Sequence, residues 1–249
     1  MSDRVALVTG STSGIGAAIA RRLASDGYVV ALHGRRSAAE GEAMTKEAGA
    51  ASYHSTDLSD VEHAGALVRS VLEKHGRLDA LVNNAGTTKF VDLKDLDGIS
   101  AADFQNICAV NVVGPFQMIR AFAPLLRNSA SAAVVNISSI APLIGGGSSV
   151  AYIASKGALN ALSLVLARVL GPEIRVNVVA PGMVDSPWLR NGLGPERFAA
   201  MLRNYESTSA LNSLVLPEEV AETVYYLGAV ASKTTGEVHL VDGGRRLGR

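Results

Sequence analysis

VALVTGSTSGIG, residues 5–16, joins a run of four apolar residues to a turn with glycines at positions 10, 14 and 16. Glycine permits the tight backbone of such a turn and lets a phosphate approach closely, and a helix beginning here would offer free N–H groups and a favourable dipole. The spacing differs from G-x-G-x-x-G, and a glycine-rich turn can also serve the fold alone. Between a strand and a helix, however, it predicts a dinucleotide-binding site.

Short apolar runs rich in β-branched residues alternate with helix-length segments along the rest of the chain. Most of these runs are nearly continuous, as in strands buried on both faces of a parallel sheet with helical crossovers, and they predict an α/β fold. The strands are expected at residues 5–9, 28–33, 51–56, 78–83, 132–138, 174–180 and 237–241. The helices are expected at about residues 14–26, 37–48, 60–75, 101–128, 150–171 and 217–228.

Two segments depart from this alternation. Residues 87–100 are rich in Asp and Lys, and residues 182–216 contain Pro187, Pro195 and the only tryptophan, Trp188. Long irregular segments in a compact α/β domain are usually functional. We expect residues 182–216 to form a lid over the substrate.

Length and charge fit one soluble domain that spans residues 1–249 without a linker. The 23 basic and 23 acidic side chains cancel, so the chain lacks the charge excess of a nucleic-acid or anionic-membrane binder. Three arginines, Arg245, Arg246 and Arg249, are interpreted as a solvated tail or a subunit contact. We expect no apolar run that spans a bilayer, and therefore a cytoplasmic protein.

Cysteine and histidine give no sign of a disulfide or a metal site. The single cysteine, Cys108, lies in an apolar helical pattern typical of a core thiol. The five histidines lack the spacing of metal ligands. We predict no bound metal.

A tyrosine and a lysine, Tyr152 and Lys156, lie four residues apart in one predicted helix. At 3.6 residues per turn both side chains share a helix face, so the ammonium can stabilise the phenolate. Tyrosine needs such help because its ordinary pKa is about 10, and a nearby cation lowers that pKa. Ser139, thirteen residues earlier, could bind the same substrate oxygen. The spacing alone also fits a half-buried tyrosine beside a solvated lysine.

Seven signals, in the family's order, resemble the short-chain dehydrogenase/reductase family over essentially the whole chain. They are TGxxxGIG at residues 9–16, Asp57, the Asn-Asn-Ala-Gly run at residues 83–86, Asn111, Ser139, the Tyr152/Lys156 pair and Pro181-Gly182. The resemblance implies a Rossmann-type doubly wound sheet of seven parallel strands, a nicotinamide cofactor, and hydride transfer between an alcohol and a carbonyl.

The resemblance further implies a homotetramer or homodimer, with the helices at residues 101–128 and 150–171 as the main subunit contact. Within the family, the pattern is most similar to 3-oxoacyl-carrier-protein reductases. Residues 127–132 nevertheless lack the basic cluster that often meets an acidic carrier protein there.

By the same resemblance, catalysis is assigned to Asn111, Ser139, Tyr152 and Lys156. During reduction Tyr152 would donate a proton to the carbonyl oxygen, while Ser139 hydrogen-bonds that oxygen. Lys156 would favour the tyrosinate and bond the nicotinamide ribose, and Asn111 would hold a water that links Lys156 to solvent. Alternatively, the Asn111 amide satisfies local backbone at a helix kink. Ser139 is preferred to Ser138 by its spacing, and because strand alternation sends its neighbour to the opposite face.

The end of the second predicted strand governs the choice between NAD and NADP. Gly34 stands where NAD-preferring relatives carry Asp, and Arg35 follows it. Because an arginine pairs with a 2′-phosphate and a carboxylate repels it, we favour NADP(H), with NAD(H) as an alternative. Arg36 is a second candidate for the phosphate, or simply a solvated side chain. Ser13 weakens this assignment, since many NADP-preferring members carry a basic residue there.

The other predicted cofactor contacts, besides Tyr152 and Lys156, come from the first turn and from the loops after the third, fourth and sixth strands. These residues are Gly10, Ser11, Ser13, Gly14, Ile15, Gly16, Asp57, Leu58, Asn84, Ala85, Gly86, Pro181, Gly182, Val184 and Ser186.

The predicted substrate pocket is more apolar than charged. Its contacts are expected to be Ser139, Ile140, Tyr152, Met183 and Trp188. Trp188 is equally compatible with a role as an anchor for the lid. Apart from Lys156 and Arg190 of the lid, we expect no lysine or arginine near the active centre, which disfavours a small dianionic substrate.

The sequence therefore predicts an NADP(H)-dependent reductase that converts a carbonyl, apolar or of the 3-oxoacyl type, reversibly into a secondary alcohol. Two alternatives stay open. One is an NAD-dependent dehydrogenase of a secondary alcohol or sugar. The other is a cofactor-binding regulator without catalysis, against which the four intact catalytic residues argue.

Overall fold

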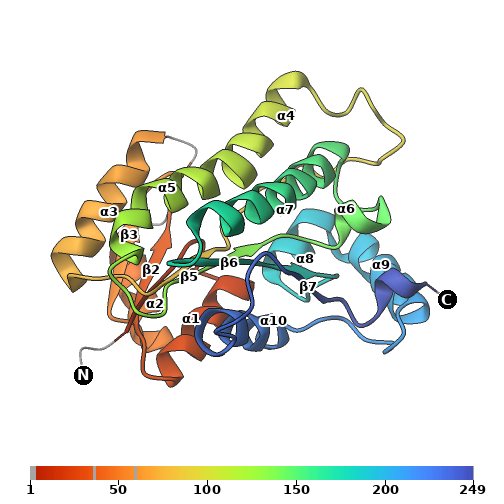
Figure 1. The fold of residues 1–249 in the computed structure, drawn as a ribbon. Helices are drawn as coiled ribbons and strands as arrows, with labels where there is room; N and C mark the ends of the chain where they lie inside the picture. The colour runs from red at the N-terminus through yellow and green to blue at the C-terminus, as the bar shows by residue number, and fades with distance from the viewer. Residues whose placement is uncertain (1–3, 36–37, 59–60, 249) are drawn as a thin grey trace.

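A sheet of seven parallel strands runs through the centre of the molecule (Figure 1). The computed structural model describes residues 4–35, 38–58 and 61–248, and its strand order is β3-β2-β1-β4-β5-β6-β7. The strands are β1 (Val5–Val8), β2 (Val29–Gly34), β3 (Ser52–Ser55), β4 (Ala80–Asn83), β5 (Ala133–Ile137), β6 (Arg175–Pro181) and β7 (Val238–Val241). The predicted α/β class, Rossmann-type order and seven strands are confirmed.

Helices cover both faces of this sheet (Figure 1). They are α1 (Gly14–Ser25), α2 (Ala38–Ala48), α3 (Val61–His75), α4 (Ala101–Cys108), α5 (Gly114–Leu126), α6 (Ala141–Ile144), α7 (Val150–Leu170), α8 (Pro187–Leu193), α9 (Pro195–Thr208) and α10 (Pro217–Tyr225). Two π-helical turns, η1 (Ala109–Val113) and η2 (Tyr226–Val230), and a 3₁₀ turn, η3 (Arg245–Leu247), complete the set.

The core has two layers, one on each face of the sheet. On one face Leu67 of α3, Phe122 of α5 and Leu170 of α7 pack against apolar strand residues. On the other face Ile19 of α1 and Val224 of α10 do the same. Strand side chains are therefore buried in both directions, which explains why the strands read as continuous apolar runs.

The strand order reverses between β1 and β4, and the loops that follow these two strands meet there. Asn84, which follows β4, donates hydrogen bonds from Nδ2 to the carbonyl oxygens of Thr9 and Gly10, at 2.9 and 3.0 Å. A Cβ placed on Gly16 would lie 2.3 Å from the Gly10 oxygen, so this close approach requires glycine. Such a reversal is where open α/β sheets bind their ligands.

The helix predicted at residues 101–128 is one rod with a π-helical turn inside it, because α4, η1 and α5 follow one another directly. Two helical stretches, Ala101–Leu126 and Val150–Leu170, are long and apolar enough to cross a membrane by length and composition. This corrects the expectation that no such run exists. In the fold both stretches supply core residues against the sheet, and that packing accounts for their apolar composition.

The segment at residues 182–216, predicted as irregular, is largely helical. Pro187 and Pro195 are the first residues of α8 and α9. Proline is favoured at this position because its N–H would have no partner within the helix and its φ is already helical. A parallel bridge between Val184 and Val215 ties the two ends of the segment together.

Candidate active site

A cavity of about 1220 Å³ opens at the carboxyl ends of the central strands. It extends from Gly34 and Arg35, which follow β2, to the helices α8 and α9. All but two of the predicted site residues line it. The two exceptions are Ser11 and Asn111, and both are buried behind its wall.

The start of α7 brings Tyr152 and Lys156 to the cavity. Ser149 caps this helix and accepts a hydrogen bond from the Tyr152 N–H at 3.3 Å. The Lys156 Nζ lies 5.7 Å from the centre of the Tyr152 ring and donates to the Ile137 carbonyl oxygen at 2.8 Å. The i, i+4 geometry predicted from the sequence is therefore present, and two of the three ammonium protons stay available to other partners.

Burial governs the pKa values of this pair. It raises the pKa of Tyr152 to about 12, although a side-chain hydrogen bond with Ser139 acts in the opposite direction. It lowers the pKa of Lys156 to about 8. The expected net lowering of the Tyr152 pKa is therefore not found in this arrangement, because desolvation of the phenolate dominates.

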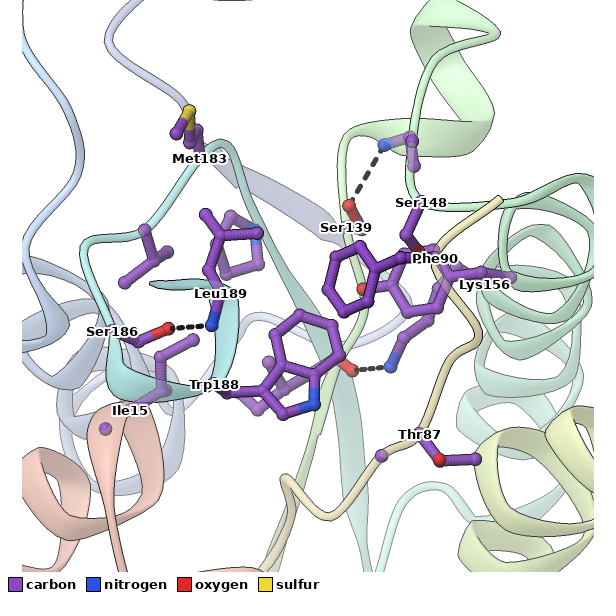
Figure 2. A pocket seen from close by; sticks show the side chains of 18 of the residues that line it. Ile15, Thr87, Phe90, Ser139, Ser148, Lys156, Met183, Ser186, Trp188 and Leu189 are labelled. Atoms are coloured by element: carbon purple, nitrogen blue, oxygen red, sulfur yellow. Dashed lines mark hydrogen bonds between the residues drawn. The ribbon is translucent and has the colours of Figure 1, made fainter. Parts of the chain in front are cut away.

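The two serines after β5 have different partners. The Ser138 hydroxyl is buried and donates to the Lys156 carbonyl oxygen at 3.2 Å. The Ser139 hydroxyl faces Tyr152 and accepts a hydrogen bond from the Ala141 N–H at 3.1 Å (Figure 2). Since β5 ends at Ile137, the direction of each hydroxyl is set by its own hydrogen bonds rather than by strand alternation. Ser139 is the one placed beside the phenol.

Asn111 lies in the π-helical turn η1 and is fully buried. Its Oδ1 accepts from the Thr87 N–H at 2.8 Å, and its Nδ2 donates to the Thr87 oxygen at 2.9 Å and to the Ser155 Oγ at 3.0 Å. The amide thus fixes the loop after β4 against α7. These contacts fit the alternative given for Asn111, an amide that satisfies backbone at a helix irregularity.

The glycine-rich turn fits the phosphates of a dinucleotide. Ser13 precedes α1 without a side-chain cap, so the first N–H groups of the helix stay available for an anion. Gly14 has a φ of +52°, and a Cβ there would meet nothing closer than the Ser186 Cβ at 3.5 Å. Ser11 is different: its hydroxyl accepts from the His33 N–H at 2.9 Å inside the protein, so it fixes the turn to β2 and does not face the cavity.

After β2, Gly34 and Arg35 line the cavity together with Asp57 and Leu58. A Cβ on Gly34 would lie 2.7 Å from the Thr12 Cγ2, so a larger residue here would require the Thr12 side chain to move. Arg35 is exposed at the cavity edge. Arg36, the second candidate for a phosphate, lies outside the described residues.

Pro181, Gly182, Val184 and Ser186 line the cavity, and Ser186 lies near Ile15 of the glycine-rich turn (Figure 2). The Ser186 hydroxyl accepts a hydrogen bond from the Leu189 N–H at 3.4 Å and so caps α8. Ser186 therefore links the floor of the cavity to the segment that covers it.

An aromatic wall stands next to Tyr152. Trp188 of α8 lies 6.4 Å from the Tyr152 ring and 5.5 Å from the Phe90 ring, measured between ring centres (Figure 2). A Cβ on Gly192 would fall 2.0 Å from Phe90, so the ring packs directly on the backbone of α8. Phe90 was not predicted as a site residue. The sequence signal that could have identified Phe90 is its position four residues after the Asn-Asn-Ala-Gly run, which itself leads into the cavity.

Sequence reasoning also missed cations in the cavity. Arg197 of α9 and Arg245 of η3 line it, although Arg245 was interpreted as a solvated tail or subunit contact. Arg190, the lid arginine that was predicted nearby, forms two 2.7 Å hydrogen bonds with Asp185 and does not line the cavity. Within the described part of the chain, no three His, Cys, Asp or Glu side chains gather as metal ligands would.

Comparison with known proteins gives matches over nearly the full length. A family model described as enoyl-(acyl carrier protein) reductase matches residues 10–246. A protein named as ketoacyl reductase 2 of the granaticin polyketide synthase, from Streptomyces violaceoruber, is 43% identical over 98% of this chain and 96% of its own length. The 3-oxoacyl-[acyl-carrier-protein] reductase FabG of Thermotoga maritima is 31% identical, with 98% of each chain covered.

A solved structure from Burkholderia xenovorans, titled as a short-chain dehydrogenase/reductase, superposes with a TM-score of 0.89 at 39% identity and with both chains covered completely. These matches agree with the strand order, the glycine-rich turn and the Tyr152/Lys156 pair described above. The chain therefore belongs to the short-chain dehydrogenase/reductase family.

Proposed function

We propose that this protein reduces a ketone to a secondary alcohol with NADPH, and that Tyr152 is the proton donor. The observation that carries the proposal is the position of Ser139, Tyr152 and Lys156 on one wall of a cavity that also contains the glycine-rich turn. A ketone in this cavity would have its oxygen next to a phenol, a hydroxyl and an ammonium.

The proposed chemistry needs a proton at one atom and a fixed orientation of the carbonyl. When bound, the nicotinamide supplies the hydride that reaches the carbonyl carbon. Tyr152 gives its phenolic proton to the carbonyl oxygen, and the raised pKa of Tyr152 keeps that proton in place at neutral pH. Ser139 hydrogen-bonds the same oxygen and favours the developing negative charge. The Lys156 ammonium compensates the negative charge of the tyrosinate that forms. It also binds the nicotinamide ribose.

NADP(H) is the proposed cofactor, since Arg35 offers a cation at the cavity and the preceding Gly34 carries no carboxylate. We expect Arg35→Ala to raise the Kd of NADPH roughly 10- to 100-fold, because hydrogen bonds to charged groups contribute about 1.5–3 kcal/mol. The Kd of NADH, which has no 2′-phosphate, is expected to change little. Fluorescence titration of both cofactors measures this. Equal or better use of NADH by the wild-type protein would contradict the assignment of Arg35.

The depressed pKa of Lys156 predicts how cofactor binding depends on pH. The ammonium is present below about pH 8 and is lost above it, so we expect NADPH affinity to decrease as pH rises through that value. Lys156→Met removes the titrating group, and its weaker binding should no longer change near pH 8. Titrations of both proteins from pH 6.5 to 9.5 test this, and an identical pH dependence in the two would reject the role of Lys156.

The substrate is proposed to be apolar or a 3-oxoacyl-type ketone. Trp188 and Phe90 supply the apolar surface near Tyr152, and Met183 also lines the cavity. The segment at residues 182–216 is proposed as the lid, because α8 and α9 cover the cavity and share a small core of their own that includes Phe198 and Tyr205. The named functions of the relatives from Streptomyces and Thermotoga support a ketoacyl group.

A homotetramer or homodimer is proposed, in which α4, α5 and α7 form the main subunit contact. Exposed apolar side chains on these helices support this contact: Phe104, Phe116, Leu164, Val165 and Val169. A cytoplasmic location stays a prediction.

A substrate panel with NADPH tests the proposed function. It contains simple ketones, 3-oxoacyl thioesters and cyclic diketones, and NADPH oxidation is followed by absorbance. We expect turnover of at least one class. Turnover only with NAD and a secondary alcohol or sugar would favour the dehydrogenase alternative. NADPH binding without turnover of any ketone would favour a non-catalytic regulator.

A further inference from the structure

Two arginines face the part of the cavity that α9 covers. Arg197 lies in the first turn of α9, and Met201, Asn204 and Tyr205 continue the same face of that helix along the cavity. Arg245 reaches the cavity from η3, the turn after β7. Segments far apart in sequence thus each place an arginine on the lining of one cavity.

The turn that carries Arg245 is firmly fixed. The Asp242 carboxylate accepts hydrogen bonds from the backbone N–H groups of Gly244 and Arg246, both at 2.9 Å. The Tyr205 hydroxyl donates to the Asp242 carbonyl oxygen at 2.6 Å. These bonds hold the turn against α9, and the Arg245 guanidinium lies 6.0 Å from the centre of the Tyr205 ring.

Neither guanidinium is neutralised by a neighbour in the described structure. Both oxygens of the nearest turn carboxylate, Asp242, accept backbone N–H groups, and no carboxylate of the described residues forms an ion pair with Arg197 or Arg245. By contrast, Arg190 of the same lid forms an ion pair with Asp185 at 2.7 Å and does not line the cavity. Arg245 is half-buried and Arg197 is exposed. An unpaired guanidinium that faces a cavity is the arrangement that binds a carboxylate or phosphate.

Other charges in the cavity do not change this conclusion. Arg35 and Asp57 lie at the opposite end, beside Gly34. Asp92 and Lys94 are exposed at the edge formed by residues 87–100, and the Asp92 carboxylate accepts the Lys94 N–H at 2.9 Å. Near α9 the charge is positive, whereas next to Tyr152 the wall is aromatic.

We propose that the substrate is a ketone with an apolar body and an anionic group, carboxylate or phosphate, which Arg245 and Arg197 bind beneath α9. This inference rests on the proposed function, since it names the substrate class of the same site. It also departs from the expectation that no lysine or arginine other than Lys156 and Arg190 lies near the active centre, on which a small dianionic substrate was disfavoured. Arg245 fixes the position of the anion, and the aromatic wall of Trp188 and Phe90 holds the apolar body beside Tyr152.

Two matched substrate pairs test the proposal and separate the two kinds of anion. The first pair is an aryl keto acid and its methyl ester. The second is a 3-oxoacyl-coenzyme A, which carries phosphates, and the same 3-oxoacyl group on N-acetylcysteamine, which carries none. We expect Arg245→Gln to raise KM for the anionic member of one pair roughly 10- to 100-fold. For the neutral member KM should stay within twofold, and kcat should change little for either.

Matched control variants exclude a general effect of losing an arginine. Arg246→Gln alters the exposed neighbour of Arg245, and Arg203→Gln alters an exposed arginine of α9 outside the cavity. Both should behave as wild type, whereas Arg245→Lys should restore part of the preference for the anion. A non-reducible aryl carboxylate, titrated by calorimetry, gives a readout without turnover, and its Kd should rise in Arg245→Gln.

The outcomes separate this inference from the function on which it rests. If the wild-type protein reduces the neutral members but shows no selective loss for either anion in Arg245→Gln, the anion site is wrong and the reductase stands. If the wild-type protein reduces no member of either pair with NADPH, the proposed function fails and the substrate class falls with it.

Discussion

Replacing Tyr152 with phenylalanine should reduce kcat for ketone reduction about 10²- to 10⁴-fold, the usual contribution of a positioned general acid. The change removes one oxygen atom and leaves the ring that packs 6.4 Å from Trp188 in place. Because the cofactor contacts of the glycine-rich turn are untouched, the Kd of NADPH should stay within a few-fold of the wild-type value. Steady-state kinetics and a fluorescence titration on the same preparation measure both quantities.

Tyr226→Phe is the matched control, because Tyr226 is exposed in η2 and does not line the cavity. It should retain wild-type kcat. If Tyr152→Phe also kept a kcat within a few-fold of wild type, another group would be the proton donor and the proposed chemistry would be wrong.

Lys156→Met should impair both catalysis and cofactor binding. Methionine keeps much of the apolar stem of the buried lysine but removes the ammonium that donates to the Ile137 oxygen at 2.8 Å. We expect kcat to fall about 10²- to 10³-fold, as when one preorganised donor is lost. The Kd of NADPH should rise about tenfold or more, since a charge-assisted hydrogen bond to the ribose is lost.

The combination of effects distinguishes Lys156 from Tyr152. A melting temperature measured with and without NADPH shows whether the variant is folded and whether the cofactor still stabilises it. Lys233→Met, an exposed lysine away from the cavity, is the control. A Lys156→Met protein that lost kcat but bound NADPH like wild type would show that Lys156 does not hold the ribose.

The fold could be predicted because its signals are local. The inner strands, such as Val5–Val8 or Ala133–Ile137, are buried on both faces and therefore read as apolar runs without any knowledge of their neighbours. The helices α8 and α9 escaped prediction because residues 182–216, which contain Pro187 and Pro195, were expected to be irregular. Proline interrupts a helix from within but is favoured at its first position. Only the surrounding structure shows which of these two roles a given proline has.

The candidate site was predictable to the extent that it depends on spacing along one element. Tyr152 and Lys156 share one helix, so four residues of separation were enough to place them together. Arg245 comes from a turn whose position depends on Asp242 and Tyr205, and no local pattern reveals that contact. The Tyr152 pKa was also beyond sequence reasoning, because burial of the phenol, rather than the distance to the lysine, dominates it.

The central claim is that the protein transfers hydride to a ketone and that Tyr152 supplies the proton. The most direct test mixes wild-type protein with NADPH and each ketone of the panel at pH 7, and quantifies both NADP⁺ and the alcohol by chromatography. We predict one alcohol for each NADPH consumed with at least one ketone, and alcohol formation from that ketone at least about 10²-fold slower in a parallel reaction with Tyr152→Phe. Bound NADPH without any alcohol from the wild-type protein, or equal alcohol from both proteins, would contradict the claim.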